Sequence, residues 1–127
     1  EQLIWEKFIC NVAYSGPCSI FRKTLGEVMG NKQMFEVAKG CALEARKMGD
    51  IKNVNFTFDD TIKYITEFGK KLLDSKPSML QDVEAKRLSE IDAINGMVVT
   101  LGEENSIETP FNLAVSSIIK AYEEDYK

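Results

Sequence analysis

The first stretch of the chain, residues 3–15 (LIWEKFICNVAYS), places three polar side chains in an otherwise apolar sequence. Lys7, Asn11 and Ser15 follow one another at steps of four, so on a helix they form one stripe. A helix that is apolar on all sides is expected to be buried, and a buried ammonium is costly without a partner or a wet cavity. The stripe is therefore a candidate wall of a functional site, carrying a cation, an amide and a hydroxyl.

The same spacing has a simpler interpretation. Lys7 could lay its aliphatic stem on the core and extend its charge to water, which is ordinary for lysines on helices. Spacing alone does not decide between a site lysine and a lysine of this kind.

A second stretch, residues 76–96 (KPSMLQDVEAKRLSEIDAING), carries two patterns typical of helix starts. Ser78 followed by Gln81, and Ser89 followed by Asp92, both have the spacing of a capping box, and Glu90 falls in the first turn of the second predicted helix. Helix capping alone explains these polar residues. A helix N-terminus with a serine hydroxyl is also a good position for a carboxylate or phosphate, so Ser78 is a candidate binding residue.

Several classes of function are excluded by composition. The chain has no histidine, which removes His–Asp triads, imidazole bases and histidine metal sites. Its net charge of −4, without a clustered basic patch, argues against nucleic acid as a partner. No apolar run is long enough to span a membrane, and no signal-peptide pattern is present. The three cysteines form no CxxC pair and are predicted to be buried thiols in a reducing cytoplasm.

Hydrophobic periodicity predicts one all-α domain of about six helices, and 127 residues are enough for a substantial core. Residues 51–58 alternate like a strand but have no partner strand, so they are expected to form an extended loop. The predicted helices are a first one ended or kinked at Gly16-Pro17, a short one within 18–30 that closes near Gly26 or Gly30, one from Asn31 to Lys47 stopped by Gly49, one capped by Asp59 or Asp60, those that begin near Ser78 and Ser89, and a last one from Thr109-Pro110.

The last helix has a clear apolar pattern. Thr109 is expected to cap it and Pro110 to occupy its first position. The face predicted to pack on the core consists of Phe111, Ala114, Val115, Ile118 and Tyr122.

Three segments together resemble the C-terminal domain of ketopantoate reductases (2-dehydropantoate 2-reductases). PSMLQDVEAKRLSEIDAINGMVV resembles the signature of that domain, WEKFICN its helix with a catalytic lysine and an asparagine four residues on, and IETPFN its turn into the last helix. The segments occur in the family's order across nearly the whole chain, whereas residues 32–73 match only in helical character.

The resemblance implies that residues 1–127 form the helical, substrate-binding half of a two-domain enzyme. The fold would be that of the C-terminal domain of 6-phosphogluconate dehydrogenase-like reductases. The family reduces a branched 2-oxo acid with NADPH on the way to pantothenate, and an N-terminal Rossmann domain holds the nucleotide. No two glycines here stand in a GxG spacing, so that domain is absent from this chain and the chain alone is expected to be inactive.

Carried over by position, the resemblance assigns five residues. Lys7 matches the general acid that protonates the carbonyl oxygen, and Glu90 the acid that holds the substrate hydroxyl and the lysine in place. Asn11 matches an asparagine that hydrogen-bonds the substrate, and Ser78 the serine that receives its carboxylate. Ser15 stands, followed by Gly16, where the family usually has Asn-Pro, so the pocket wall is altered there.

That departure leaves a related 2-oxo acid as an alternative substrate. An alternative of another class is a non-enzymatic helical dimerisation module, in which every polar residue named above is a cap or a solvated side chain. The expected partners are a small 2-oxo acid, the Rossmann domain and, left open, a second copy in a homodimer.

Overall fold

The structure is a computed structural model that describes residues 1–126, and this part of the chain contains no strand. Its helices are α1 (Gln2–Phe21), α2 (Leu25–Gly30), α3 (Lys32–Ile51), α4 (Thr61–Lys70), α5 (Ser78–Glu84), the 3-10 helix η1 (Ile91–Ala93), α6 (Asn95–Glu104) and α7 (Pro110–Glu124). The all-α prediction is confirmed, with seven α-helices in the described residues instead of about six.

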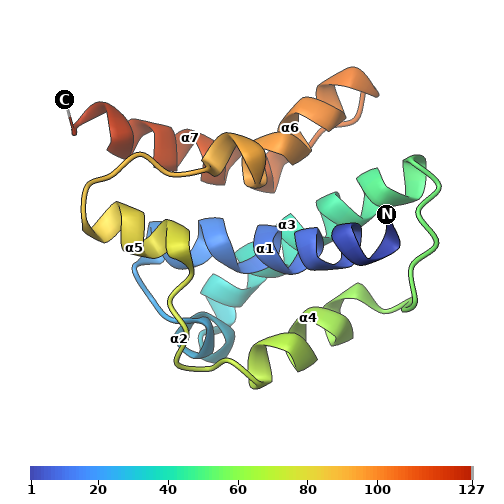
Figure 1. The fold of residues 1–127 in the computed structure, drawn as a ribbon, viewed down its shortest axis with the longest axis horizontal. Helices are drawn as coiled ribbons and strands as arrows, with labels where there is room; N and C mark the ends of the chain where they lie inside the picture. The colour runs from blue at the N-terminus through green and yellow to red at the C-terminus, as the bar shows by residue number, and fades with distance from the viewer. Residues whose placement is uncertain (127) are drawn as a thin grey trace.

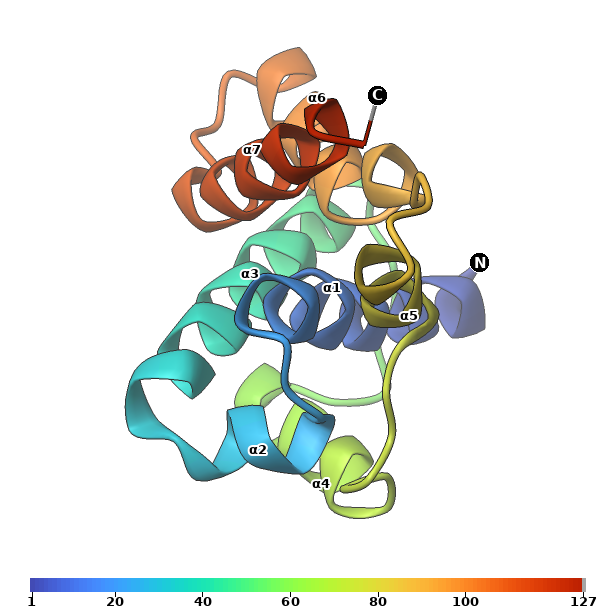
Figure 2. The same ribbon diagram turned by 90° about the vertical axis from the view of Figure 1, so that its left-hand side faces the viewer.

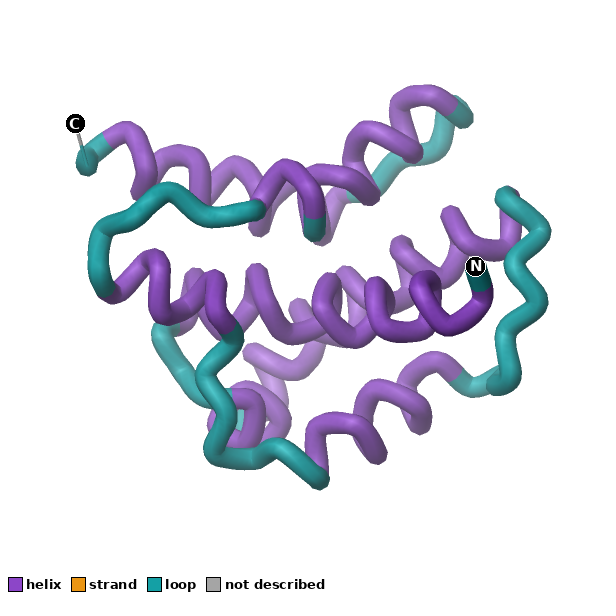
Figure 3. Tube along the Cα trace, in the orientation of Figure 1, coloured by secondary structure: helices purple, strands orange, loops and turns teal. Residues whose placement is uncertain are grey.

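Helix α1 runs through the middle of the molecule and contacts each of the six other α-helices (Figure 1). Helices α6 and α7 lie on one side of it, and α2 and α4 lie on the other (Figure 2). Helix α3 packs along α1, as does the short α5. The long connections from α3 to α4 and around α5 run over the outside (Figure 3). One central helix therefore organises the domain.

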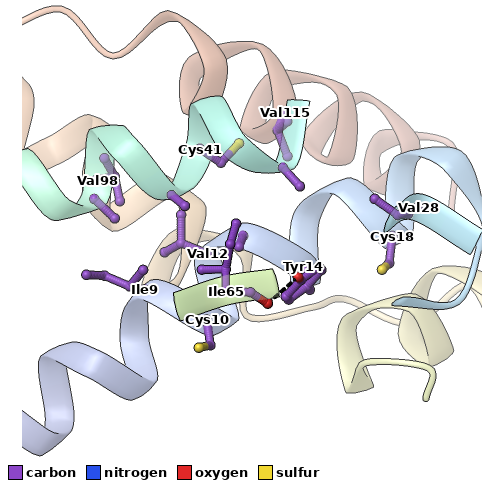
Figure 4. Close-up of a cluster of buried hydrophobic side chains, with 14 of the residues drawn as sticks. Ile9, Cys10, Val12, Tyr14, Cys18, Val28, Cys41, Ile65, Val98 and Val115 are labelled. Atoms are coloured by element: carbon purple, nitrogen blue, oxygen red, sulfur yellow. Dashed lines mark hydrogen bonds between the residues drawn. The ribbon is translucent and has the colours of Figure 1, made fainter. Parts of the chain in front are cut away.

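The core is built around the inner part of α1, where every side chain from Val12 to Ser19 is buried. Residues from all seven described α-helices contribute to this core, part of which is drawn in Figure 4, and Tyr14 donates a hydrogen bond of 2.6 Å to the carbonyl of Ile65 on α4. The prediction that the cysteines are buried is confirmed for all three. Burial raises the pKa of the Cys10 thiol to about 11 and that of Cys18 to about 12, so these thiols are protonated at neutral pH.

The prediction that Gly16-Pro17 ends the first helix is wrong, because α1 continues to Phe21. The alternative, a kink at this point, stays a prediction. A proline inside a helix removes one hydrogen bond and costs about 3 kcal/mol when exposed. Here the turn around Pro17 is fully enclosed, and its burial offsets that cost. The helix ends instead at Arg22, which adopts a left-handed conformation (φ 58°).

Glycine also proved a poor stop signal in α3. Asn31 caps this helix as predicted, accepting from the Met34 amide at 3.0 Å, but the helix passes through Gly49 to Ile51. Gly49 is needed for packing, since a Cβ there would lie 2.4 Å from the ring of Phe56. The loop predicted for 51–58 is confirmed from Lys52 onward, and Asp60 caps α4 as expected.

Neither predicted capping box in residues 76–96 is present. Helix α5 does begin at Ser78, but Pro77 occupies the capping position. The side-chain amide of Gln81 donates to the Lys76 carbonyl at 3.0 Å. Ser89 instead binds α7, because its backbone amide and its hydroxyl both donate to the Glu123 carboxylate at 2.8 Å. The predicted helix after it is only the single turn η1. The side chains of Gln81 and Ser89, which the predicted boxes would use, therefore bond to the Lys76 carbonyl and to Glu123 instead.

The buried face of α7 differs from the predicted one. Val115 is buried, but Phe111, Ala114 and Ile118 are exposed, and the core side is formed by Asn112, Val115, Ser116 and Ile119. The reason lies in α3, where the Glu44 carboxylate accepts from the Phe111 amide at 2.9 Å and the Asn112 amide at 3.0 Å. Pro110 is the first residue of α7 as predicted, while Thr109 makes no side-chain cap and Glu44 takes that role.

Replacing Glu44 by alanine should therefore destabilise the fold. The change removes the cap of α7 and the bond of 2.8 Å that Glu44 accepts from the Asn112 side chain, so we expect a loss of about 2–3 kcal/mol in the free energy of unfolding. Urea denaturation followed by circular dichroism would measure it. Glu36→Ala, at an exposed position of the same helix, is the control; an equal effect of both variants would contradict this role of Glu44.

Candidate functional site

The polar stripe of α1 runs from solvent into the protein. Lys7 is exposed, Asn11 is half-buried, and Ser15 is only 8% exposed. The expectation that the whole of this helix is buried is wrong at its start, where Leu3 is 77% exposed and Ile4 69%. Lys7 therefore has no burial cost to offset, and none of the ion pairs within residues 1–126 includes it.

The buried charge at this end of α1 belongs to Glu6. Its carboxylate is almost enclosed and accepts from the amide of Thr57 at 2.8 Å and from its hydroxyl at 2.7 Å. These bonds join α1 to the loop before α4 and fix the rotation of the helix. Lys7, the next residue and roughly 100° further around the helix, is exposed.

The inner end of the stripe opens into a hollow of about 210 Å³. Asn11 and Ser15 line it from α1, and the segment Ser75–Pro77 lines it from the opposite side. Its remaining wall is mostly apolar and consists of Cys10, Tyr14, Leu25, Phe68 and Leu72. A mostly apolar concavity with a few polar groups at one side is the usual form of a small-molecule site.

Polar groups in this hollow lack protein partners. Neither the Asn11 amide nor the Ser15 hydroxyl hydrogen-bonds to another side chain or to the backbone within residues 1–126, although Ser15 is more than nine-tenths buried. The Tyr14 hydroxyl, in contrast, is engaged by Ile65. Both groups are open to the hollow and available to a ligand or to water, whereas the fully buried side-chain atoms without a partner among the described residues are Asn95 Oδ1 and Ser116 Oγ.

Ser78 follows directly on the segment that closes the hollow. It is exposed and opens α5, which packs on α1. The segment before it is held by the Leu25 amide, which donates to the Ser75 carbonyl at 3.2 Å. The structure thus brings Asn11 and Ser15 to the residues that immediately precede Ser78.

Glu90 is also exposed, and it lies in the connection between α5 and η1. Its position is fixed on both sides, by the bonds of Ser89 to Glu123 and by the burial of Ile91. Lys7, Ser78 and Glu90 do not line the hollow itself. The convergence of these three side chains on one substrate stays a prediction.

Two asparagines that the sequence analysis missed, Asn95 and Asn112, form hydrogen bonds that hold the backbone of α1 in place beside the stripe. The Asn95 side chain is fully buried and donates to the carbonyl of Val12 and to the side chain of Asn112, both at 2.9 Å. Asn112 in turn donates to the Cys41 carbonyl at 3.2 Å. Asn95 and Gly96 end the EIDAING motif, and a Cβ at Gly96 would lie 3.0 Å from the Ile91 carbonyl. This part of the motif fixes the backbone of α1 beside Asn11.

The sequence analysis also did not single out Ser75 and Lys76 as site residues, because nothing local distinguishes them from other loop residues.

The described residues show neither a membrane-spanning helix nor a metal-binding cluster. None of the helices in residues 1–126 has the length and apolar character needed to cross a bilayer. In the same range, no three Cys, Asp or Glu side chains gather as a metal site would require.

Comparison with known proteins identifies relatives along nearly the whole chain. Residues 1–123 match the family model described as ketopantoate reductase PanE/ApbA, C terminal. The 2-dehydropantoate 2-reductase of Archaeoglobus fulgidus is 30% identical over 123 residues, covering 97% of this chain and 41% of that protein. That of Streptococcus pyogenes serotype M3 is 31% identical over 121 residues, covering 94% and 39%. The chain spans about two fifths of the length of the curated relatives it matches.

Solved structures show the same fold. The ketopantoate reductase of the PanE/ApbA family from Ralstonia eutropha superposes with a TM-score of 0.90 at 23% identity, covering 98% of this chain and 42% of that one. D-mandelate dehydrogenase in complex with NADH and anilino(oxo)acetate superposes with a TM-score of 0.84 at 22% identity, covering 97% and 41%. Together with the family match over residues 1–123, these findings establish that the chain belongs to the ketopantoate reductase C-terminal domain family.

Proposed function

We propose that the protein containing this chain is an NADPH-dependent 2-dehydropantoate 2-reductase of the cytoplasm, acting in pantothenate biosynthesis. The observation that carries the proposal is the stripe of α1, which leads from an exposed lysine to unpartnered polar groups in a hollow. The family of the chain and the reductase activity named for its relatives support it. The chain itself is the substrate-binding and proton-donating half.

Lys7 is the proposed proton donor. Reduction of a 2-oxo acid builds negative charge on the carbonyl oxygen, and an ammonium beside that oxygen stabilises the transition state more than the ground state. Lys7 transfers a proton from its Nζ to the oxygen, which leaves an amine on the lysine and a hydroxyl on the product. Its exposed position suits a group that a second domain covers when the substrate is bound.

The remaining proposed roles follow the stripe and the segments that face it. Asn11 donates to the substrate from the rim of the hollow, and Ser15 contacts it from the interior. Ser78 donates its hydroxyl to the substrate carboxylate. Glu90 accepts from the substrate hydroxyl and holds the Lys7 ammonium in position.

The described residues do not fit a dinucleotide on their own. A pyrophosphate is held by backbone amides of a glycine-rich turn at the start of a helix, and no pair of glycines in this chain has the required spacing. We therefore assign the nucleotide to an N-terminal Rossmann domain, which accounts for the greater length of the relatives. When bound there, NADPH would supply the hydride.

A related 2-oxo acid is the alternative substrate. Ser15 is smaller than asparagine and lines the hollow together with the apolar side chains of Phe68 and Leu72, so a larger or more apolar side chain of the substrate could be accommodated. The structural likeness to D-mandelate dehydrogenase concerns the fold alone.

We also propose that the protein forms a homodimer through α7. Its exposed residues Phe111, Ala114 and Ile118 join Ile20, Phe21 and Val37 to form an apolar groove of about 450 Å³. An apolar groove of this kind is typical of an interface. A structural relative from Staphylococcus aureus is described as a dimeric ketopantoate reductase. Dimerisation adds to the enzymatic role, and the unpartnered groups of the α1 stripe disfavour a purely non-enzymatic module.

The catalytic assignment is tested with Lys7→Ala in the full-length enzyme. Loss of the proton donor should lower kcat by about a hundredfold or more. Steady-state oxidation of NADPH with ketopantoate would measure it. Ser78→Ala is the contrasting variant, since loss of a ground-state contact should mainly raise KM. Near-normal kcat in a correctly folded Lys7→Ala enzyme would identify Lys7 as a solvated lysine without a catalytic role.

The assignment of the nucleotide is tested on residues 1–127 alone. Without a glycine-rich turn, this chain should give no saturable NADPH binding in calorimetry at concentrations that saturate the full-length enzyme. Stoichiometric binding to the isolated chain would show that the cofactor site has been misplaced.

The dimer is tested with Ile118→Glu. A carboxylate in the apolar groove would be desolvated by a partner, so the variant should sediment as a monomer at concentrations where the unmodified protein is a dimer. Ser117→Glu, at the neighbouring exposed position outside the groove, should leave the dimer intact. Equal sedimentation of both variants and the unmodified protein would rule out this face.

A further inference from the structure

Lys76 is the one cationic residue that lines the hollow, within the described residues. It lies in the segment that faces Asn11 and Ser15 across the hollow, two positions before Ser78. The family resemblance assigns it no role. We propose that the Lys76 ammonium binds the carboxylate of the 2-oxo acid together with Ser78, an inference that rests on the proposed function.

The charge of the substrate carboxylate favours Lys76 as its binding partner. Ser78 is exposed and neutral, and a single exposed hydroxyl binds a carboxylate weakly because water competes for it. Lys7 is committed to the carbonyl oxygen. A carboxylate that leaves water for the hollow needs a cation within reach, and among the residues that line the hollow only Lys76 supplies one.

Lys76 has a fixed backbone and a loosely held ammonium. Its backbone is fixed, because its carbonyl accepts from the Gln81 side chain at 3.0 Å and the neighbouring Ser75 carbonyl accepts from Leu25. Its Nζ is held only loosely, at 3.3 Å from one oxygen of Glu84 and 3.4 Å from the other. Both side chains of this pair are about half exposed, at 50% and 40%.

An exposed ion pair of this kind contributes little to stability. A substrate carboxylate can therefore take the ammonium from Glu84 at small cost, while the fixed backbone limits where the ammonium can go. Ser15 lines the same hollow, and its hydroxyl is not among the fully buried unpartnered atoms of the described residues, so it is open to a ligand that occupies the hollow beside Lys76.

The experiment compares Lys76→Met with the unmodified full-length enzyme, using a 2-oxo acid and the matching 2-oxo amide, which lacks the carboxylate charge. Loss of the ammonium should raise KM for the acid about tenfold and leave kcat within about twofold, since the contact is made in the ground state. KM for the amide should not change. Added salt should raise KM for the acid less in the variant than in the unmodified enzyme.

Two further variants complete the test. Lys71→Met, at an exposed lysine of the same connection that does not line the hollow, should leave both KM values unchanged. Lys76→Arg should recover most of the affinity for the acid. An unchanged KM for the acid in Lys76→Met, or an equal rise for acid and amide, would overturn the inference while the proposed function stands. An unmodified enzyme that reduces no 2-oxo acid would refute the proposed function and this inference with it.

Discussion

The structure depends on the enclosure of one helix. Helix α1 contacts every other α-helix, and its residues 12–19 are all buried. Enclosure of this extent leaves no freedom of rotation, because Glu6 is bonded to Thr57 near one end and the Val12 carbonyl to Asn95 in the middle. The direction in which Lys7, Asn11 and Ser15 point is thus a consequence of core packing. The same contacts that bury α1 also orient the polar side chains of the candidate site.

Helical periodicity was sufficient to predict the fold class and the position of most helices, whereas helix ends were often wrong. Asn31 and Asp60 cap as expected because their partners lie three residues away. Gly49 and Pro17 did not break their helices, since both positions are tightly packed. The residues next to them in the sequence do not reveal this packing. The predicted boxes at Ser78 and Ser89 were not formed, since Gln81 and Glu123 provided other bonds.

The candidate site, like the fold, could be predicted from the sequence only in part. A spacing of four predicted the stripe, and the resemblance pointed to Ser78 and Glu90. The sequence overestimated the burial of Lys7, because an apolar pattern does not reveal that Leu3 and Ile4 remain exposed. It also missed Glu44 and Asn112, which are 68 positions apart, and it could not single out Lys76. Contacts between distant segments are beyond the reach of local patterns.

The close approach at Gly16 links helices α1 and α7. A Cβ at this position would lie 2.4 Å from Val115 of α7 and 2.6 Å from the Asn95 side chain. Helices α1 and α7 therefore share a fixed volume at this crossing, and neither can gain an atom there unless the other gives one up. Since Val115 also lines the apolar groove and Ser15 adjoins Gly16, substitutions in the groove and in the wall of the hollow are coupled through this crossing over evolutionary time.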